Sequence, residues 1–324
     1  MMRVNHVSAK YKTITGDVLA LKDVDFEIRD NEIFGIAGES GCGKSTLLKV
    51  LYDIMNFPLE LAEGSVELEY MDSGERKRLV TDREHPSGIR GAWWNAISYV
   101  PQAAQSVLNP VYRIEDQFYE LFRRHRRSEG RKAMYDRVNR YLDEVGLPRD
   151  VLKSYPHQLS GGMRQRVVIA MATFLHPSMI FADEPTTALD VVVQKGILQM
   201  LMELQAKMGN SLVIVSHDMG VHYQITNRMG IMYSGSMVEL GPTDDIFASP
   251  LHPYTQMLIR SLPKIGDQGM RVGIQGGPPD LRNPPPGCRF APRCKMAKPE
   301  CSQSAPKFTE VQPGRFAACH LLNR

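Results

Sequence analysis

Two hydrophobic periods divide this chain into candidate strands and helices. Apolar and polar residues alternate through 1–30 and again through 64–81, which is typical of antiparallel strands with one buried face. Apolar spacings of three and four predict helical structure over 114–147. Mostly apolar runs, typical of buried strands, lie at 33–37, 97–100, 179–182 and 211–216. This order predicts an α/β fold with a mixed sheet core, an antiparallel β subdomain and an inserted helical subdomain.

The first apolar run leads directly into a phosphate-binding motif. Residues 33–37 are followed by the pattern Gly38-x4-Gly43-Lys44-Ser45 and then by an apolar helix. Glycines let the backbone fold tightly and turn successive N–H groups onto phosphate oxygens. Lys44 adds a charge for the β and γ phosphates, and the Ser45 hydroxyl is placed to bind Mg²⁺. The predicted nucleotide-binding loop comprises Gly38, Glu39, Ser40, Gly41, Cys42, Gly43, Lys44, Ser45 and Thr46, with Cys42 as a small filler.

Two other apolar runs end in residues suited to phosphate chemistry. The run at 179–182 ends in Asp183 and Glu184, and the run at 211–216 is followed by His217. In an open parallel sheet, ligands gather outside the carboxyl ends of the strands. Asp183 is expected to hold Mg²⁺, Glu184 to orient or deprotonate the attacking water, and His217 to touch the γ phosphate. With the loop, these residues predict a site that hydrolyses a nucleoside triphosphate.

Composition and charge exclude several other classes of protein. The chain has 324 residues, of which 43% are hydrophobic and 23% charged, as in ordinary globular proteins. No apolar run approaches the ~20 residues that cross a bilayer, and residues 1–10 lack the features of a secretory signal. A net charge of +3 does not argue for a nucleic-acid partner, and none is expected. We expect a cytosolic protein that serves a membrane, if at all, as a peripheral subunit.

From residue 251 onward the composition shifts toward glycine and proline. Such a segment is not expected to build a core of its own. Four of the five cysteines lie within it, and in a reducing compartment this crowding favours metal ligation over disulfides. Their spacing, C-x5-C-x6-C-x17-C, matches neither bacterial ferredoxin runs nor paired C-x2-C zinc ribbons. The four are Cys288, Cys294, Cys301 and Cys319.

Five motifs in a fixed order carry a resemblance to a known family. They are the nucleotide-binding loop, LSGGMRQR at 159–166, Asp183-Glu184, ALD at 188–190 and SHD at 216–218. With them, residues 1–248 resemble the ATP-binding subunits of ABC transporters, in which a helical subdomain would occupy about 103–175. The resemblance implies that two such subunits assemble head to tail. Each ATP would then lie between the loop of one subunit and the segment Ser160, Gly161 and Gly162 of the other.

The same resemblance implies roles for individual residues. Tyr11 is implied to stack on adenine, Gln102 to sense Mg²⁺ and the membrane subunit, and Asp190 to couple the sites across the interface. Glu184 is implied to be the general base and His217 the γ-phosphate switch. The implied catalytic residues are Glu184, His217, Gln102 and Lys44, and the implied Mg²⁺ ligands are Ser45, Gln102 and Asp183.

Three further motifs narrow the resemblance to one branch. SVLNP at 106–110, HPYT at 252–255 and GCRFAPRC at 287–294 are similar to the oligopeptide/dipeptide permease branch, whose extension would occupy 249–324. Members with four cysteines at such spacing are implied to carry a [4Fe-4S] cluster, here on Cys288, Cys294, Cys301 and Cys319. Zinc and reduced thiols remain alternatives. The cluster would pin a small, irregular, cysteine-stapled domain.

The resemblance implies an ATP hydrolase that powers solute import. Its partners would be a second cassette, which is another copy or a related chain, two transmembrane permease subunits and, indirectly, an extracellular solute-binding protein. Peptides are the expected solute, with oligosaccharides or nickel as alternatives within the branch. A soluble ABC ATPase acting on nucleic acid or ribosomes is disfavoured, because the chain has neither fused cassettes nor a long coiled-coil insertion. A regulator without turnover is disfavoured by the presence of Glu184 and His217.

Overall fold

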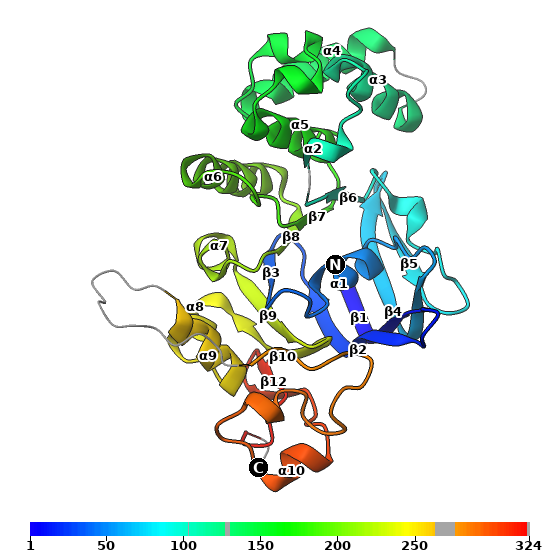
Figure 1. Ribbon diagram of the computed structural model, residues 1–324. Helices are drawn as coiled ribbons and strands as arrows, with labels where there is room; N and C mark the ends of the chain where they lie inside the picture. Colours follow the sequence, from blue (N-terminus) through cyan, green and yellow to red (C-terminus); the bar gives the residue numbers. More distant parts are fainter. Residues whose placement is uncertain (103, 127–129, 263–275, 323–324) are drawn as a thin grey trace.

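A mixed sheet runs through the centre of the computed structural model, which describes residues 1–102, 104–126, 130–262 and 276–322 (Figure 1). Its eight strands follow the order β11-β12-β10-β9-β3-β8-β7-β6. The strands from β9 to β6 are parallel, whereas β10, β12 and β11 pair antiparallel. The strands are β3 Ile33–Ala37, β6 Ile97–Val100, β7 Met179–Asp183, β8 Ser211–Val215, β9 Arg228–Tyr233, β10 Ser236–Pro242, β11 Thr309–Gln312 and β12 Arg315–Ala317.

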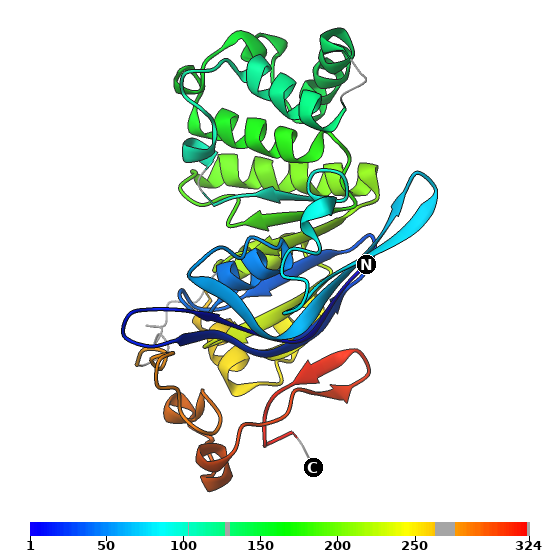
Figure 2. The same ribbon diagram turned by 90° about the vertical axis from the view of Figure 1, so that its right-hand side faces the viewer.

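A four-stranded antiparallel sheet packs beside the central one, as the alternating pattern predicts (Figures 1 and 2). Val24, Phe26 and Ile28 are buried on one face, and the residues between them are less buried. A single apolar cluster joins this face to α1 (Lys44–Leu51) and to the central sheet. The nucleotide-binding loop is therefore anchored on two sheets. The strands, in the order β2-β1-β4-β5, are β1 Met2–Tyr11, β2 Val18–Ile28, β4 Leu59–Asp72 and β5 Glu75–Thr81.

A block of helices lies between β6 and β7 in the chain and occupies the upper part of Figure 1. The helical pattern over 114–147 gives two helices, because α3 ends at His125 and α4 begins at Arg131. The long helix α6, Val191–Met208, follows β7 in the chain. The elements between β6 and β7 are α2 Ala104–Val107, α3 Ile114–His125, α4 Arg131–Glu144, η2 Arg149–Lys153, η3 Pro156–Gln158 and α5 Gly161–Thr173, and η1 Arg90–Ala92 precedes β6.

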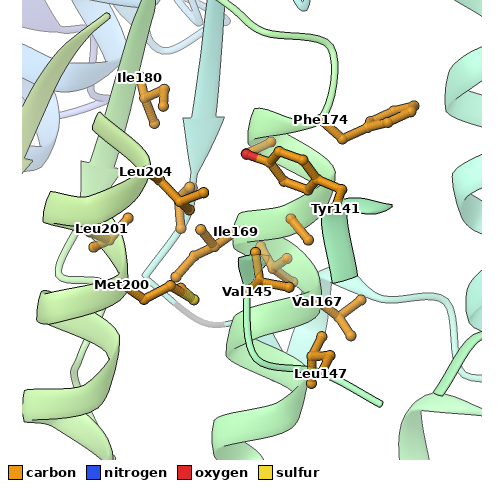
Figure 3. Packing of buried hydrophobic residues seen from close by; sticks show 14 of the residues in the cluster. Tyr141, Val145, Leu147, Val167, Ile169, Phe174, Ile180, Met200, Leu201 and Leu204 are labelled. Atoms are coloured by element: carbon orange, nitrogen blue, oxygen red, sulfur yellow. The ribbon is translucent and has the colours of Figure 1, made fainter. Parts of the chain in front are cut away.

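One continuous core fixes these helices to the sheet (Figure 3). Tyr141 of α4, Ile169 of α5 and Leu204 of α6 are buried in the same cluster as Ile180 of β7. Burial of a large apolar side chain contributes roughly 1.5–3 kcal/mol relative to exposure, so this cluster holds α5 and α6 firmly. The N-termini of both helices, which carry predicted site residues, are thereby held by a packed core.

The C-terminal segment adds two strands to the central sheet. β12 pairs with β10, and β11 then pairs with β12 and forms the edge of the sheet. Phe290 is buried against the rings of Tyr233 and Tyr254. The expectation that this segment depends on cysteine staples was therefore wrong in part, because sheet pairing and aromatic packing hold it. The remaining helices are α7 Met219–Ile225, α8 Thr243–Ala248, α9 Pro253–Ser261, η4 Ala291–Arg293 and α10 Pro299–Gln303.

Within the described ranges, every helix is too short or too polar to cross a lipid bilayer.

Candidate nucleotide site

The predicted nucleotide-binding loop connects β3 to α1 and is tightly folded. Gly38 has a φ of 150°, and a Cβ there would lie 2.3 Å from the carbonyl oxygen of Met232 on β9. Lys44 folds back over the loop, where its Nζ donates to the carbonyl oxygens of Gly38 at 2.7 Å and Glu39 at 2.9 Å. An ammonium held this way can exchange carbonyl oxygens for phosphate oxygens without moving its stem. The loop has the backbone that phosphate binding requires.

The other loop residues divide into exposed and buried positions. Ser40 and Gly41 are exposed, whereas Cys42 is buried and its carbonyl oxygen accepts a hydrogen bond from the Gly235 N–H at 2.8 Å. Burial raises the pKa of the Cys42 thiol. Cys42 therefore fills space beneath the loop, as predicted from its size. Gly43 has a φ of 105° at the start of α1, and the Thr46 hydroxyl lies 3.1 Å from that of Tyr11.

Asp183, at the end of β7, lies beside Ser45. The Ser45 hydroxyl donates to Oδ1 of Asp183 at 3.1 Å, and the Tyr99 hydroxyl donates to Oδ2 at 3.1 Å. Burial raises the pKa of Asp183, although both hydrogen bonds oppose the shift. A nearby cation would favour the ionised form. The hydroxyl and carboxylate oxygens are the ligand type that Mg²⁺ prefers, so these two residues fit the predicted ion.

Glu184 is the centre of a hydrogen-bonded group. Its Oε2 accepts from Gln102 Nε2 at 2.9 Å and from the Thr187 hydroxyl at 2.9 Å, while Oε1 lies 3.0 Å from Nδ1 of His217. Partial burial by itself raises the pKa of Glu184, but the hydrogen bonds from His217 and Thr187 and the charge of Lys44 outweigh it and lower the pKa. The carboxylate is therefore ionised and oriented, as a general base requires.

Strained backbone accompanies this geometry. Glu184 has a φ of 46°, in the left-handed region that non-glycine residues rarely adopt. Such conformations cost of order 1–3 kcal/mol and persist where surrounding contacts impose them. Here the three side-chain contacts to the carboxylate accompany the strain. Gln102 contacts the base, and its predicted contact with Mg²⁺ stays a prediction.

The segment Ser160-Gly161-Gly162 begins α5, away from the loop of its own chain (Figure 1). Ser160 caps the helix, because its side chain accepts from the N–H of Met163 at 3.3 Å. Asp190 caps α6 in the same way, accepting from the N–H groups of Val192 and Val193. In the part of the chain that the structure describes, both cap side chains hydrogen-bond N–H groups of their own helices and not the loop at 38–46. One chain therefore brings together the loop, Asp183, Glu184 and His217, but not Ser160 or Asp190.

Comparison with known proteins decides the family. The model described as "ABC transporter" matches residues 21–187, and the model "Oligopeptide/dipeptide transporter, C-terminal region" matches residues 238–301. A dipeptide transport ATP-binding protein of Bacillus subtilis is 39% identical over 272 residues, which cover 83% of this chain and 78% of that protein. The chain belongs to the ABC transporter family. It is an ATP-binding protein, an ABC transporter ATPase, of the oligopeptide/dipeptide import branch.

Two further relatives agree with this assignment. A putative peptide import ATP-binding protein of Brucella ovis is 40% identical over 263 residues, which cover 79% of this chain and 76% of that protein. A solved ATP-binding cassette, in a dimeric post-hydrolysis state bound to ADP and Pi, matches with a TM-score of 0.62 and 28% identity. That match covers 75% of this chain and 99% of the solved chain. The α/β fold with an antiparallel sheet is thus that of an ABC-type P-loop NTPase.

The predicted cysteine centre is not supported by the arrangement of the ABC cassette's tail. In the ranges that the structure describes, no group of three or more His, Cys, Asp or Glu side chains is placed to hold a metal ion. Burial raises the pKa of the thiols of Cys288, Cys294 and Cys319, and neighbouring cysteines add to the shift. Neutral thiols are poor ligands, since the thiolate is the form that binds metals. A [4Fe-4S] or zinc site stays a prediction.

Four residues without a predicted role contact the site. Tyr99 hydrogen-bonds Asp183, and Thr187 hydrogen-bonds Glu184. Tyr99 lies near the carboxyl end of β6 and Thr187 soon after β7, and these positions could have indicated a place at the site. Tyr254 and Arg293 contact Glu39 from the C-terminal segment. Tyr254 lies in the HPYT motif, but no local pattern could indicate a contact across 254 residues, as for Arg293 and Glu39.

Proposed function

We propose that this ABC cassette is the ATP-hydrolysing subunit of an importer that takes up peptides through partner membrane permeases. One observation carries the proposal: the nucleotide motifs and the oligopeptide/dipeptide C-terminal region occur in a single chain. The two relatives named for dipeptide transport and peptide import support peptides as the solute class. Oligosaccharides and nickel, the alternatives within the branch, are outcomes of the test below.

The residues of the site perform distinct steps in this proposal. The N–H groups of the loop and Lys44 bind the phosphates of ATP. Mg²⁺, held by Ser45 and Asp183, would neutralise charge on the phosphates. Glu184 accepts the proton of the attacking water, and its lowered pKa keeps it ionised for this step. His217 and Gln102 hold the carboxylate of Glu184 in one orientation, and His217 lies where it can also reach the γ phosphate.

The complete ATP site is proposed to need a second cassette. Ser160, Gly161 and Gly162 present the N-terminus of α5, whose free N–H groups and dipole suit a γ phosphate. A dimeric cassette bound to ADP and Pi is among the solved structures that this chain resembles, which supports the arrangement. The partner cassette is another copy or a related chain, and Asp190 would couple the two sites. Adenine would stack on Tyr11.

The importer is proposed to be a membrane assembly. Two transmembrane permease subunits would bind the cassette pair at the cytoplasmic face, so the cassette is a peripheral membrane protein. An extracellular solute-binding protein would deliver the solute to the permeases and would contact the cassettes only indirectly. No nucleic acid takes part. ATP-driven closure and opening of the cassette pair would move the permeases.

The chain is proposed to comprise an ATPase domain at 1–248, with a helical subdomain at 103–175, and an extension at 249–324. The extension is proposed to hold a [4Fe-4S] cluster on Cys288, Cys294, Cys301 and Cys319, with zinc as the alternative. The backbone brings two of these residues together, since the Cys288 N–H donates to the carbonyl oxygen of Cys301 at 2.7 Å. Ligation would require these thiols to lose their protons.

Reconstitution tests the transport proposal. The cassette is purified from native membranes with its co-purifying permeases and binding protein, and the assembly is placed in proteoliposomes with internal ATP and Mg²⁺. Uptake of labelled dialanine, maltotriose and Ni²⁺ is then compared with that of an assembly carrying Glu184→Gln. ATP-dependent uptake of dialanine supports the proposal. Uptake of only maltotriose or Ni²⁺, or purification without permeases, would overturn it.

A metal assay tests the extension. Protein prepared without oxygen is analysed for iron, acid-labile sulfide and zinc, beside a Cys294→Ser variant and wild-type protein prepared in air. Close to four irons and four sulfides per chain, lost in the variant, supports the cluster. Zinc without iron would refute the [4Fe-4S] cluster and support the zinc site. Metal-free wild-type protein that unfolds at the same urea concentration as Cys294→Ser would refute both metal sites.

A further inference from the structure

The C-terminal segment reaches back to the nucleotide-binding loop and contacts Glu39 in two ways. Arg293, the last residue of η4, pairs with both carboxylate oxygens of Glu39, with Nη1–Oε2 at 2.7 Å and Nη2–Oε1 at 3.0 Å. The hydroxyl oxygen of Tyr254, on α9, accepts a hydrogen bond from the backbone N–H of Glu39 at 2.9 Å. The side chain and the backbone of one loop residue are thus both held from beyond residue 250.

Both contacts come from groups that the fold has already fixed. The Arg293 side chain is 6% exposed, and its Nη1 also donates to the Tyr233 hydroxyl at 3.2 Å. Tyr254 is fully buried, and its ring packs against those of Tyr233 and Phe290. Two-pronged arginine–carboxylate pairs are among the stronger and more directional contacts in proteins. The loop therefore meets a rigid support.

Glu39 connects this support to the phosphate-binding lysine. The carbonyl oxygen of Glu39 accepts from Lys44 Nζ at 2.9 Å, and that of the preceding Gly38 accepts from the same atom at 2.7 Å. A Cβ on Gly38 would overlap Met232 of β9, so that residue is fixed from the other side. A loose Glu39 would release both the loop backbone and one of the two oxygens that hold Lys44.

We propose that Arg293 and Tyr254 are positioning residues of the ATP site, which hold Glu39 so that the loop is set for phosphate before ATP binds. Ordering a loop during binding costs conformational free energy and weakens affinity. In the part of the chain that the structure describes, the hydrogen bonds of Arg293 and Tyr254 at the site go to Glu39 and Tyr233 and not to Glu184, Asp183 or His217. The effect is therefore expected on nucleotide affinity and not on the chemical step. The C-terminal segment is then a working part of the ATP site. This inference depends on ATP binding by the ABC cassette and not on the transported solute.

Two small substitutions test the proposal in the full-length chain. Tyr254→Phe removes only the hydroxyl, and Arg293→Met removes the charge while it keeps the length of the stem. Affinity is measured by titration with a fluorescent ATP analogue and Mg²⁺, and kcat by phosphate release at saturating ATP. We expect the dissociation constant to rise about 3- to 10-fold for Tyr254→Phe and about 10-fold or more for Arg293→Met. We expect kcat to change by less than about twofold in both.

Matched controls use residues of the same types away from the loop. Tyr223→Phe changes an exposed tyrosine of α7 and Arg282→Met an exposed arginine of the C-terminal segment, and both variants are expected to bind nucleotide as the wild type does. Far-UV circular dichroism and urea midpoints check that each variant is folded. Tyr254→Phe keeps its buried ring, so it decides the question even if Arg293→Met does not fold.

A double variant shows whether Arg293 acts through Glu39. In a Glu39→Gln background, Arg293→Met is expected to weaken binding by much less than it does alone, because the paired carboxylate is already gone. Affinities within about twofold of wild type for folded single variants would overturn the proposal, since a lost hydrogen bond is expected to exceed that. A fall in kcat with unchanged affinity would also overturn it. So would a double variant in which Glu39→Gln and Arg293→Met raise the dissociation constant by the product of their separate effects. Wild-type protein that fails to bind ATP would instead contradict the family assignment.

Discussion

Glu239 of β10, which is completely buried, is paired with Arg315 of β12 at 3.4 Å. The Glu239 carboxylate also accepts from the N–H groups of Leu251 and His252, both at 2.8 Å, so a single side chain binds the start of the C-terminal segment and one of its last strands. Breaking a buried ion pair is costly because the remaining charge is left without a partner. Glu239 thus holds the segment that supports the nucleotide-binding loop.

Glu239→Gln is expected to lower the free energy of unfolding by about 3–5 kcal/mol, since Arg315 would stay buried without a carboxylate. Urea denaturation followed by circular dichroism measures the change. Asp143→Asn is the control, because Asp143 pairs with Arg149 on the surface and both side chains are largely exposed. Equal midpoints for the two variants would contradict the importance of the buried pair.

Glu184→Gln is expected to abolish steady-state ATP hydrolysis while ATP binding is retained. The amide cannot accept the proton of the attacking water, and general-base catalysis typically contributes 10²–10⁴-fold to a rate. Phosphate release measures turnover, and a fluorescent ATP analogue measures binding. Glu203→Gln, at an exposed position of α6, serves as the matched control. Unchanged turnover in Glu184→Gln would remove this residue as the base.

His217→Ala is expected to change the pH dependence of hydrolysis as well as its rate. The hydrogen bond from His217 is the largest of the contacts that lower the pKa of Glu184, and without it partial burial acts with less opposition and raises that pKa. A base with a higher pKa is protonated at a higher pH, so the acidic limb of the kcat profile is expected to move toward neutral pH. The profile is measured from pH 5 to 8. A lower rate with an unmoved limb would mean that His217 does not act through Glu184.

Ser160→Asp is expected to prevent ATP-dependent dimerisation of the Glu184→Gln protein. Asp keeps the helix cap of α5 but places a negative charge where the phosphate of the partner's ATP is proposed to lie. Ser160→Asn is the neutral control, which also caps the helix. Light scattering with ATP and Mg²⁺ gives the oligomeric state. Dimers of equal amount in both variants would contradict the composite site.

His222 is expected to make the protein less stable in acid. It is fully buried on α7, its Nε2–H donates to the carbonyl oxygen of Ser216 at 3.1 Å, and burial lowers its pKa to about 4 from 6.5. Below pH 6.5 His222 is protonated in the unfolded chain but stays neutral in the folded protein. The free energy of unfolding therefore falls as the pH drops from 6.5 toward 4. The loss amounts to about 3 kcal/mol.

Urea denaturation at pH 7.5 and pH 5 measures this dependence. His222→Gln removes one titrating group and is expected to flatten the difference between the two pH values, whereas His157→Gln, at an exposed position, is expected to leave it unchanged. Burial lowers the pKa of His252 to about 3, so part of the dependence remains in the variant. An unchanged difference in His222→Gln would show that His222 is not the group responsible.

Local sequence determined most of the elements and most of the nucleotide chemistry. The apolar runs predicted β3, β6, β7 and β8, and the residues that follow them were placed at one edge of the sheet, because side-chain period and strand direction act over a few residues. Ser45 and Asp183 were expected to lie together because both were predicted to bind the same Mg²⁺, and the structure brings their side chains into contact. In the C-terminal segment, composition led to the wrong expectation that cysteine staples were needed. A segment poor in apolar residues can still be held by pairing with β10 and by packing of Phe290 against Tyr233 of the main domain.

Only the tertiary structure decided which distant residues meet. Whether Gln102 and His217 would both contact Glu184, and whether Arg293 would reach Glu39 across 254 residues, depended on how the sheets and the C-terminal segment pack against one another. Sequence spacing carries no information about such contacts, because they form when long stretches of chain close on a common core. The motifs therefore predicted the chemistry of the nucleotide site, whereas tertiary packing decided which residues hold its side chains and its loop in place.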